Sequence, residues 1–160
     1  MRWKMVVNVG KTKVMVTSSS TDDHAWDPGM FTKAKPIESV HDYKFLGVTV
    51  SNDLRFNEHL DMTVDRCKKR VDVLKCMANK SWGNPLETQR TLYIQYIRSA
   101  LEYTSCSWSP WILDTGLKRL QRIQNDALRS IAGWTKTYPW EFLHLETGIE
   151  PLEDIFDKNN

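Results

Sequence analysis

The apolar residues of this chain change their spacing near residue 55, and this change constrains the fold more than any other feature of the sequence. Before it, the apolar pattern has a period near two, and the run from Tyr43 to Val50 is aromatic and β-branched, as strands often are. From Leu60 to Ile131 the apolar residues recur every three or four positions, which is typical of amphipathic helices. The sequence therefore predicts an α+β fold in which a small antiparallel sheet precedes a three- to four-helix bundle.

Several short strands are expected before residue 55. Turn-forming residues separate them, and Gly47, which has no side chain to pack, marks a bend or a close backbone approach within the last one. The predicted strands are Met5–Val7, Lys13–Thr17, Ile37–Val40 and Tyr43–Val50, the last two forming a hairpin that turns at His41–Asp42.

The first predicted helix follows Asn57 and ends at Gly83. Its apolar positions are spaced 4-3-4-3-4 and form one narrow stripe: Leu60, Val64, Cys67, Val71, Leu74 and Ala78. A second helix is predicted after Asn84 (N-cap) and Pro85 (N1). Its apolar residues cover a broad arc of about 200°, so we expect it at the centre of the bundle. They are Leu92, Tyr93, Ile94, Tyr96, Ile97, Ala100, Leu101 and Tyr103.

Three further helices complete the prediction. One begins at a capping Asp114 and ends near Gly133, a short one runs from Trp140 to about Glu146 and is stopped by Gly148, and another starts at Pro151. This last helix stops after barely one turn, which suggests that the chain is a fragment.

Charge is distributed unevenly although the net charge is only +2. Residues 55–136 contain 14 Lys/Arg against 8 Asp/Glu, whereas residues 137–160 contain one Lys against six acids. The three cysteines lack C-x-x-C spacing, the four histidines lack metal-binding spacing, and no apolar run approaches the roughly 20 residues of a membrane span. We therefore expect an intracellular protein, in the nucleus or cytoplasm, with plain thiols, no metal site and no membrane partner.

Two helix faces concentrate the basic residues. Arg66, Lys69, Arg70 and Lys80 are expected opposite the apolar stripe of the first helix, and Lys118, Arg122 and Arg129 share a face of the third. Same-sign charges along one face suit a phosphate backbone, although an ordinary solvated face has the same pattern. Lys68 and Lys75 lie close to acids and are expected to be surface ion pairs.

Two short segments resemble a known family. Asn8–Met15 (NVGKTKVM) and Tyr43–Val48 (YKFLGV) are similar to the end of the palm of reverse transcriptases from non-LTR (LINE-type, jockey-like) retrotransposons. The residues that follow resemble that family's helical thumb in order and spacing, for example Arg98-Ser99, Leu101-Glu102-Tyr103 and Gln121–Arg129 (QRIQNDALR).

The resemblance implies three regions: a palm edge (1–54), a helical thumb (55–136) and short C-terminal helices (137–160). It places Lys11 at the motif D lysine, a general-acid candidate, and Phe45, Leu46 and Gly47 at the primer grip. The family's catalytic Asp motifs would precede residue 1, and Asp22-Asp23 lies in a polar loop. The chain alone is therefore predicted to be inactive and without a cofactor, whereas the parent enzyme would use Mg²⁺.

The resemblance further implies that the seven basic residues hold the backbone of the RNA template and of the RNA–DNA or DNA primer duplex. The missing upstream palm and fingers of the same polyprotein would be the other partner. An alternative is a non-catalytic helical protein-interaction module, or an inactive retroelement relic. A hydrolase or nuclease has no supporting carboxylate or histidine arrangement.

Overall fold

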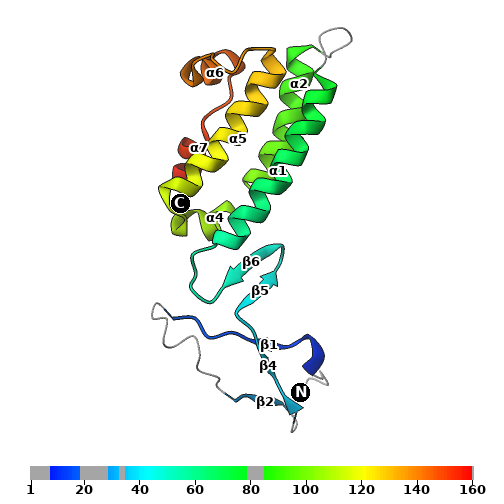
Figure 1. Cartoon of the computed structure of the whole chain (residues 1–160), viewed down its shortest axis with the longest axis vertical. Helices are drawn as coiled ribbons and strands as arrows, with labels where there is room; N and C mark the ends of the chain where they lie inside the picture. The colour runs from blue at the N-terminus through cyan, green and yellow to red at the C-terminus, as the bar shows by residue number, and fades with distance from the viewer. Residues whose placement is uncertain (1–7, 19–28, 33–34, 79–84, 160) are drawn as a thin grey trace, which may run out of the picture. The chain divides into compact units, whose positions relative to one another are not determined.

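The computed structural model describes residues 8–18, 29–32, 35–78 and 85–159. The chain forms two compact units, Met1–Phe56 and Asn57–Asn160, which are described separately (Figure 1). The predicted strand Met5–Val7 and the predicted helix signals Gly83 and Asn84 lie outside the described residues.

The first unit contains short strand pairs and one 3₁₀ turn, η1 (Val9–Lys11). Strand β1 (Lys13–Val14) pairs in parallel with β4 (Glu38–Ser39), and β2 (Phe31–Thr32) pairs antiparallel with β3 (Lys35–Pro36). Strand β5 (Asp42–Phe45) pairs antiparallel with β6 (Val48–Ser51). The described strands are only two to four residues long.

The hairpin differs from the prediction. Tyr43–Val50 is not one strand: the chain turns at Leu46 and Gly47, and β5 and β6 are the two arms. Both turn residues have positive φ, 47° and 88°, as a type I′ turn requires. A hairpin turned at His41–Asp42 was therefore the wrong prediction, and Gly47 was the signal of the true turn.

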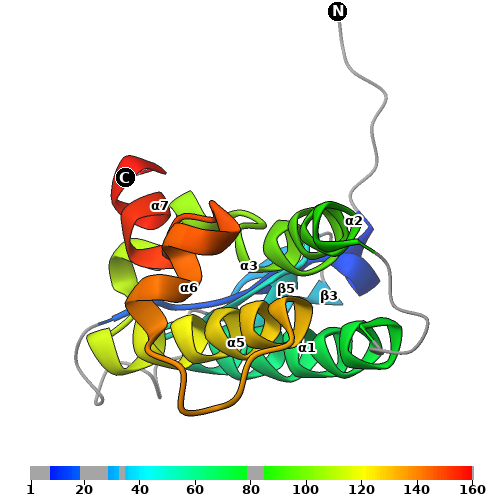
Figure 2. The ribbon, with the colours of Figure 1, turned by 90° about the horizontal axis from the view of Figure 1, so that it is seen from above.

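The second unit is built on two long helices, α1 (Asn57–Met77) and α5 (Asp114–Ala132), which lie side by side (Figures 1 and 2). The stripe predicted for α1 is confirmed for Leu60, Val64, Cys67, Val71 and Leu74, which are all buried. The sixth predicted member, Ala78, follows the end of α1 and is half-buried. Gly116 of α5 lets the helices approach closely. A Cβ atom at that position would lie 2.7 Å from Cδ2 of Leu60.

The predicted second helix is divided into three segments that pack behind α1 and α5. These are α2 (Leu86–Leu92), the π-helical turn η3 (Tyr93–Arg98) and α3 (Ser99–Leu101). Tyr93, Ile97 and Leu101 are fully buried, but Tyr96 and Tyr103 are 42% and 49% exposed. The segment therefore packs against the bundle on one side only, and part of its apolar arc is exposed rather than buried as expected.

The remaining elements of the second unit come directly before and after α5 in the chain. Helix α4 (Ser105–Trp108) and the 3₁₀ turn η4 (Ser109–Trp111) precede α5, while α6 (Trp140–Thr147) and α7 (Leu152–Asn159) pack on α5 after it. Helix α7 has eight residues, so the expectation that it stops after barely one turn was wrong. The buried Trp108 ring meets His59 and Phe156 edge-on, at centroid distances of 5.5 and 5.6 Å. Gly133 and Gly148 end α5 and α6 in left-handed conformation, as predicted.

Two predicted helix starts were wrong by one residue. Pro85, predicted at N1, occupies the N-cap of α2. Asp114 is the first residue of α5, Leu113 occupies the N-cap, and no side chain caps the helix. The α+β class is confirmed: small strand pairs precede a mainly helical unit. None of the helices in the described ranges is both long and apolar enough to span a bilayer.

Candidate nucleic-acid interface

Helix α1 separates apolar and basic residues onto different faces. Its inner stripe is buried, whereas Arg66 and Lys69 are exposed and no carboxylate lies within ion-pair distance of either among the described residues. Lys75 pairs with Asp72 at 3.4 Å, as predicted. Lys68 is exposed and has no ion-pair partner among the described residues, so its predicted pairing is wrong.

A groove of about 510 Å³ lies between α1 and η3, and we call it the α1–η3 groove. Three of the predicted interface residues line it together with one acid, two aliphatic side chains and an aromatic ring. The lining residues are Met62, Asp65, Arg66, Lys69, Arg70, Val73 and Tyr96. The groove thus combines an excess of positive charge with exposed apolar surface.

Arg70 is not on the outermost face of α1, as the sequence had suggested, but half-buried at its edge. Its Nη1 donates a hydrogen bond to the backbone oxygen of Tyr96, and its guanidinium lies over the Tyr96 ring, 4.8 Å from the centroid. This combined contact fixes the guanidinium against η3 and leaves its charge at the groove.

Three of the four basic residues of α5, Lys118, Arg119 and Arg122, line two hollows. Lys118 and Arg122 border one of about 300 Å³ together with Gln121, Asn125, Trp140, Pro151 and Glu153. Arg122 also lines a groove of about 470 Å³ between α1 and α5, where Lys68, Lys75 and Arg119 join it beside Asp72 and Asp126. Sequence reasoning set Lys68 and Lys75 aside, because only packing of α1 against α5 brings them to Arg122. It also did not single out Arg119, which precedes Arg122 by three residues on α5.

Arg129 is engaged within the fold. Its side chain is 19% exposed, Nη1 lies 3.6 Å from Oδ1 of Asp126, and Nη2 donates to the Tyr138 backbone oxygen at 3.3 Å. Arg119 likewise pairs with Asp61 at 2.6 Å. Two of the four cations on α5 thus have intramolecular partners.

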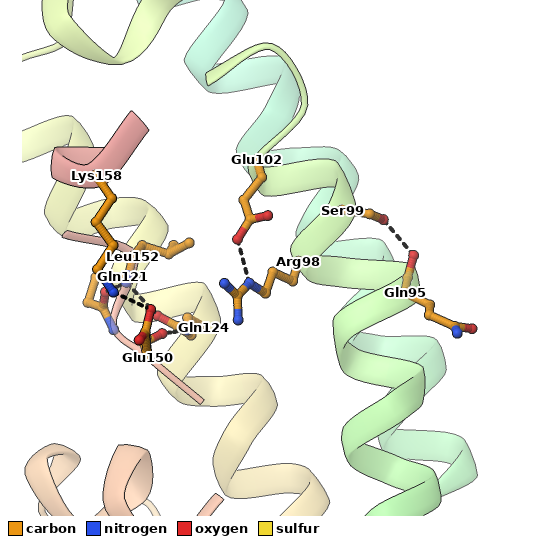
Figure 3. A network of polar contacts seen from close by, with 9 residues as sticks. All are labelled: Gln95, Arg98, Ser99, Glu102, Gln121, Gln124, Glu150, Leu152 and Lys158. Carbon is orange, nitrogen blue, oxygen red and sulfur yellow. Dashed lines mark hydrogen bonds and ion pairs between the residues drawn. The ribbon is translucent and has the colours of Figure 1, made fainter. Parts of the chain in front are cut away.

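Amide side chains of α5 hold the segment that leads into α7 (Figure 3). Gln124 is fully buried; its Nε2 donates to the Glu150 backbone oxygen at 2.8 Å, and its Oε1 accepts from the Leu152 N–H at 3.0 Å. Gln121 Oε1 accepts from the same N–H at 2.9 Å. These two side chains are structural, although their residue type also suits contacts with phosphate or sugar.

Two ion pairs flank this network (Figure 3). Arg98 pairs with Glu102 one turn later, and Lys158 pairs with Glu150 at 2.9 Å. The hydrogen bond from Lys158 lowers the pKa of the exposed Glu150 carboxyl. Because of its ion pair with Glu102, Arg98 also has an intramolecular partner.

In the first unit, Lys11 is exposed at the end of η1, and its N–H donates to the Asn8 oxygen at 3.1 Å. The predicted primer-grip residues lie at the β5–β6 turn, where Phe45 and Leu46 are 62% and 73% exposed. The turn thus presents two large apolar side chains to solvent.

Comparison with known proteins gives two relatives, both from Drosophila melanogaster. The chain is 26% identical over 116 residues to a probable RNA-directed DNA polymerase from transposon BS, covering 72% of the chain and 13% of that protein. It is 23% identical over 159 residues to a probable RNA-directed DNA polymerase from transposon X-element, covering 99% of the chain and 17% of that protein. The chain is reverse transcriptase-like.

This reverse transcriptase-like chain spans less than a fifth of the length of either relative. No family model matches it, and no solved structure matches it. The similarity agrees with the family resemblance of the motifs at the coarse level of an RNA-directed DNA polymerase from a transposon.

Of the predicted site residues, Lys80 lies outside the described part of the chain, as does the pair Asp22-Asp23. In the described ranges no group of three or more His, Cys, Asp or Glu side chains is placed to hold a metal ion. The described residues therefore offer no such ligand group for the Mg²⁺ that the parent enzyme would use.

Proposed function

We propose that this chain is part of the reverse transcriptase of a non-LTR retrotransposon, and that its helical unit holds a template–primer duplex through the phosphate backbone. The observation that carries the proposal is the similarity to a transposon RNA-directed DNA polymerase over 159 residues. In this proposal residues 1–54 are the edge of the palm, residues 55–136 form the thumb, and residues 137–160 are its short C-terminal helices.

The charge arrangement supports backbone binding. Arg66 and Lys69 are exposed on α1, with no ion-pair partner in the residues that the structure describes, and Arg70 is fixed beside them. Cations that are not neutralised by the protein can displace the counterions condensed on nucleic acid, and this release drives binding at low salt. Lys118 and Arg122 extend the proposed contact on α5. Arg129 contacts Asp126 and the Tyr138 backbone oxygen, so its backbone-binding role rests on the sequence prediction alone.

The first unit has a complementary proposed role. The exposed Phe45 and Leu46 at the hairpin turn would contact the primer end, and Lys11 would face the leaving pyrophosphate in the intact enzyme. Both roles depend on upstream residues of the parent protein and are proposals about that protein.

Filter binding of an RNA–DNA hybrid to the full chain tests the duplex-holding role. Between about 50 and 200 mM salt, the logarithm of the association constant should fall linearly with the logarithm of salt concentration. In the double variant Arg66→Gln/Lys69→Gln the slope should decrease by roughly two, about one for each phosphate that the variant no longer neutralises.

A matched control removes the same charge elsewhere. The variant Lys136→Gln/Lys158→Gln changes two exposed cations outside the α1–η3 groove, one of which is already paired with Glu150. Its slope should remain that of the unaltered chain. Equal slopes for both double variants, or binding that is indifferent to salt, would contradict the proposal and favour a protein-interaction module.

A further inference from the structure

The α1–η3 groove contains more than a phosphate site requires. Besides Arg66, Lys69 and Arg70 it is lined by Met62 and Val73, which are 36% and 48% exposed. Charged residues alone would suffice to hold a duplex, whose bases are stacked inside it and whose outside offers mainly phosphate and sugar. The exposed apolar side chains of the groove therefore suit an apolar ligand group, which the outside of a duplex does not offer.

The aromatic ring in the groove is placed there by the backbone. Tyr96 lies in the π-helical turn η3, where Tyr93 and Ile97 take the fully buried positions, and its own side chain remains 42% exposed. π-Helical turns within α-helices are frequent at functional sites because they change the direction of individual side chains.

Arg70 lies over one face of the Tyr96 ring, and both side chains line the groove. Its guanidinium lies over the Tyr96 ring at 4.8 Å, and the hydrogen bond to the Tyr96 oxygen restrains it there. Aromatic rings and arginine guanidinium planes are the two kinds of protein surface on which unpaired bases stack. The charges of Arg66 and Lys69 lie in the same groove, within reach of the phosphates that flank such a base.

We infer that the α1–η3 groove binds an unpaired nucleotide of single-stranded RNA or DNA, with the base stacked on the Tyr96–Arg70 pair and the adjacent phosphates on Arg66 and Lys69. The inference deepens the proposed function and rests on it, since it makes this groove the place where a single-stranded segment next to the held duplex is bound. The groove volume of about 510 Å³ is sufficient for one nucleotide.

The test measures fluorescence anisotropy of a labelled single-stranded RNA of about 12 nucleotides, a length within the usual site sizes of single-strand binding proteins. Titration with the full-length Tyr96→Leu variant should show a dissociation constant about 5- to 150-fold higher than for the unaltered chain, as removal of one base–aromatic stack predicts. The salt slope should be unchanged because no charge is removed, and Tyr96→Phe should bind normally.

Two controls separate stacking from general damage. Tyr103→Leu removes another tyrosine that is 49% exposed but does not line the groove, and binding should not change. A strand with the same backbone but without bases should bind the unaltered chain and Tyr96→Leu equally. Tyr96→Leu should also bind the RNA–DNA hybrid as the unaltered chain does.

Each outcome decides one question. If Tyr96→Leu weakens binding of the base-free strand or of the hybrid as much as that of the normal strand, stacking of an unpaired base is refuted while duplex binding stands. If Tyr96→Leu binds single-stranded RNA normally, the inference is likewise wrong. If the unaltered chain binds neither single strand nor hybrid in a salt-dependent way, the proposed function itself fails.

Discussion

Helices α1 and α5 are both basic, but they use their charges differently. On α1, Arg66 and Lys69 are exposed without a carboxylate partner within the part of the chain that the structure describes. On α5, Arg119 pairs with Asp61, and Arg129 contacts Asp126 and the Tyr138 backbone. Arg66 and Lys69 of α1 are therefore available to a ligand, whereas two of the four cations on α5 contribute to the fold.

The difference teaches that helix periodicity locates a charge but does not show whether it is available. Asp61 lies 58 residues from Arg119, and Tyr138 lies on a loop after α5 that the helical pattern does not position. Charge counts alone would therefore treat α1 and α5 as equal interfaces. The following predictions test whether α1 is the binding helix and α5 the structural one.

The largest effect is expected from the amides of α5. In Gln121→Leu/Gln124→Leu the Leu152 N–H and the Glu150 backbone oxygen are left without their side-chain partners. An unsatisfied buried polar group costs about 1–3 kcal/mol, so the free energy of unfolding should fall by roughly 2–4 kcal/mol in urea titrations. Gln95 is an exposed glutamine on η3, and Gln95→Leu should change the same quantity by less than about 0.5 kcal/mol.

Equal effects of the two substitutions would contradict the structural role assigned to α5. The double variant should still bind nucleic acid with an unchanged salt slope at temperatures where it is folded, because none of the α1–η3 groove residues is altered.

An intermediate effect on the free energy of unfolding is expected when the pH is raised, because the buried Cys67 thiol lies on the inner face of α1. Burial raises the pKa of the Cys67 thiol from 9.0 to about 11, against the opposing charges of Arg70 and Arg66. Because the folded-state pKa is the higher one, the stabilisation is complete below pH 9 and is lost as the pH rises through about 11. The free energy of unfolding should decrease by roughly 2 kcal/mol over this interval.

The Cys67→Ala variant isolates this contribution. Tyr93, whose pKa burial also raises, is present in both proteins, so the difference between their pH profiles reports on Cys67. At pH 8 a thiol reagent should modify the exposed Cys76 and Cys106 rapidly and Cys67 only after unfolding. Rapid modification of all three thiols in the folded chain would show that the α1 stripe is not buried.

Much of the helical unit could be predicted from the sequence because its signals are local. The 4-3-4-3 spacing identified the buried residues of α1. Gly133 and Gly148 marked the ends of two helices, because glycine readily adopts the left-handed conformation found there. The turn at Leu46–Gly47 was missed because the apolar run continues across it, and only Gly47 interrupts the strand-like pattern.

The candidate site was less predictable because it depends on packing. The position of Arg70 against Tyr96 requires a contact between residues 26 apart, and the exposure of Tyr96 follows from a π-helical turn that periodicity does not reveal. Sequence pattern found Arg66 and Lys69 correctly as exposed cations, but it could not distinguish them from Arg129, whose partner lies beyond the helix.

The smallest effect, and the most direct comparison, comes from single charge removals on the two helices. Arg129→Gln deletes the contacts to Asp126 and Tyr138 and should lower the free energy of unfolding by about 1 kcal/mol. Arg66→Gln removes an exposed cation without an ion-pair partner among the described residues and should change it by less than about 0.5 kcal/mol. For hybrid binding the order should reverse, with Arg66→Gln decreasing the salt slope by about one and Arg129→Gln leaving it unchanged. If Arg129→Gln instead decreased the slope while leaving stability intact, α5 would be the binding helix, and the distinction between the two helices would have to be inverted.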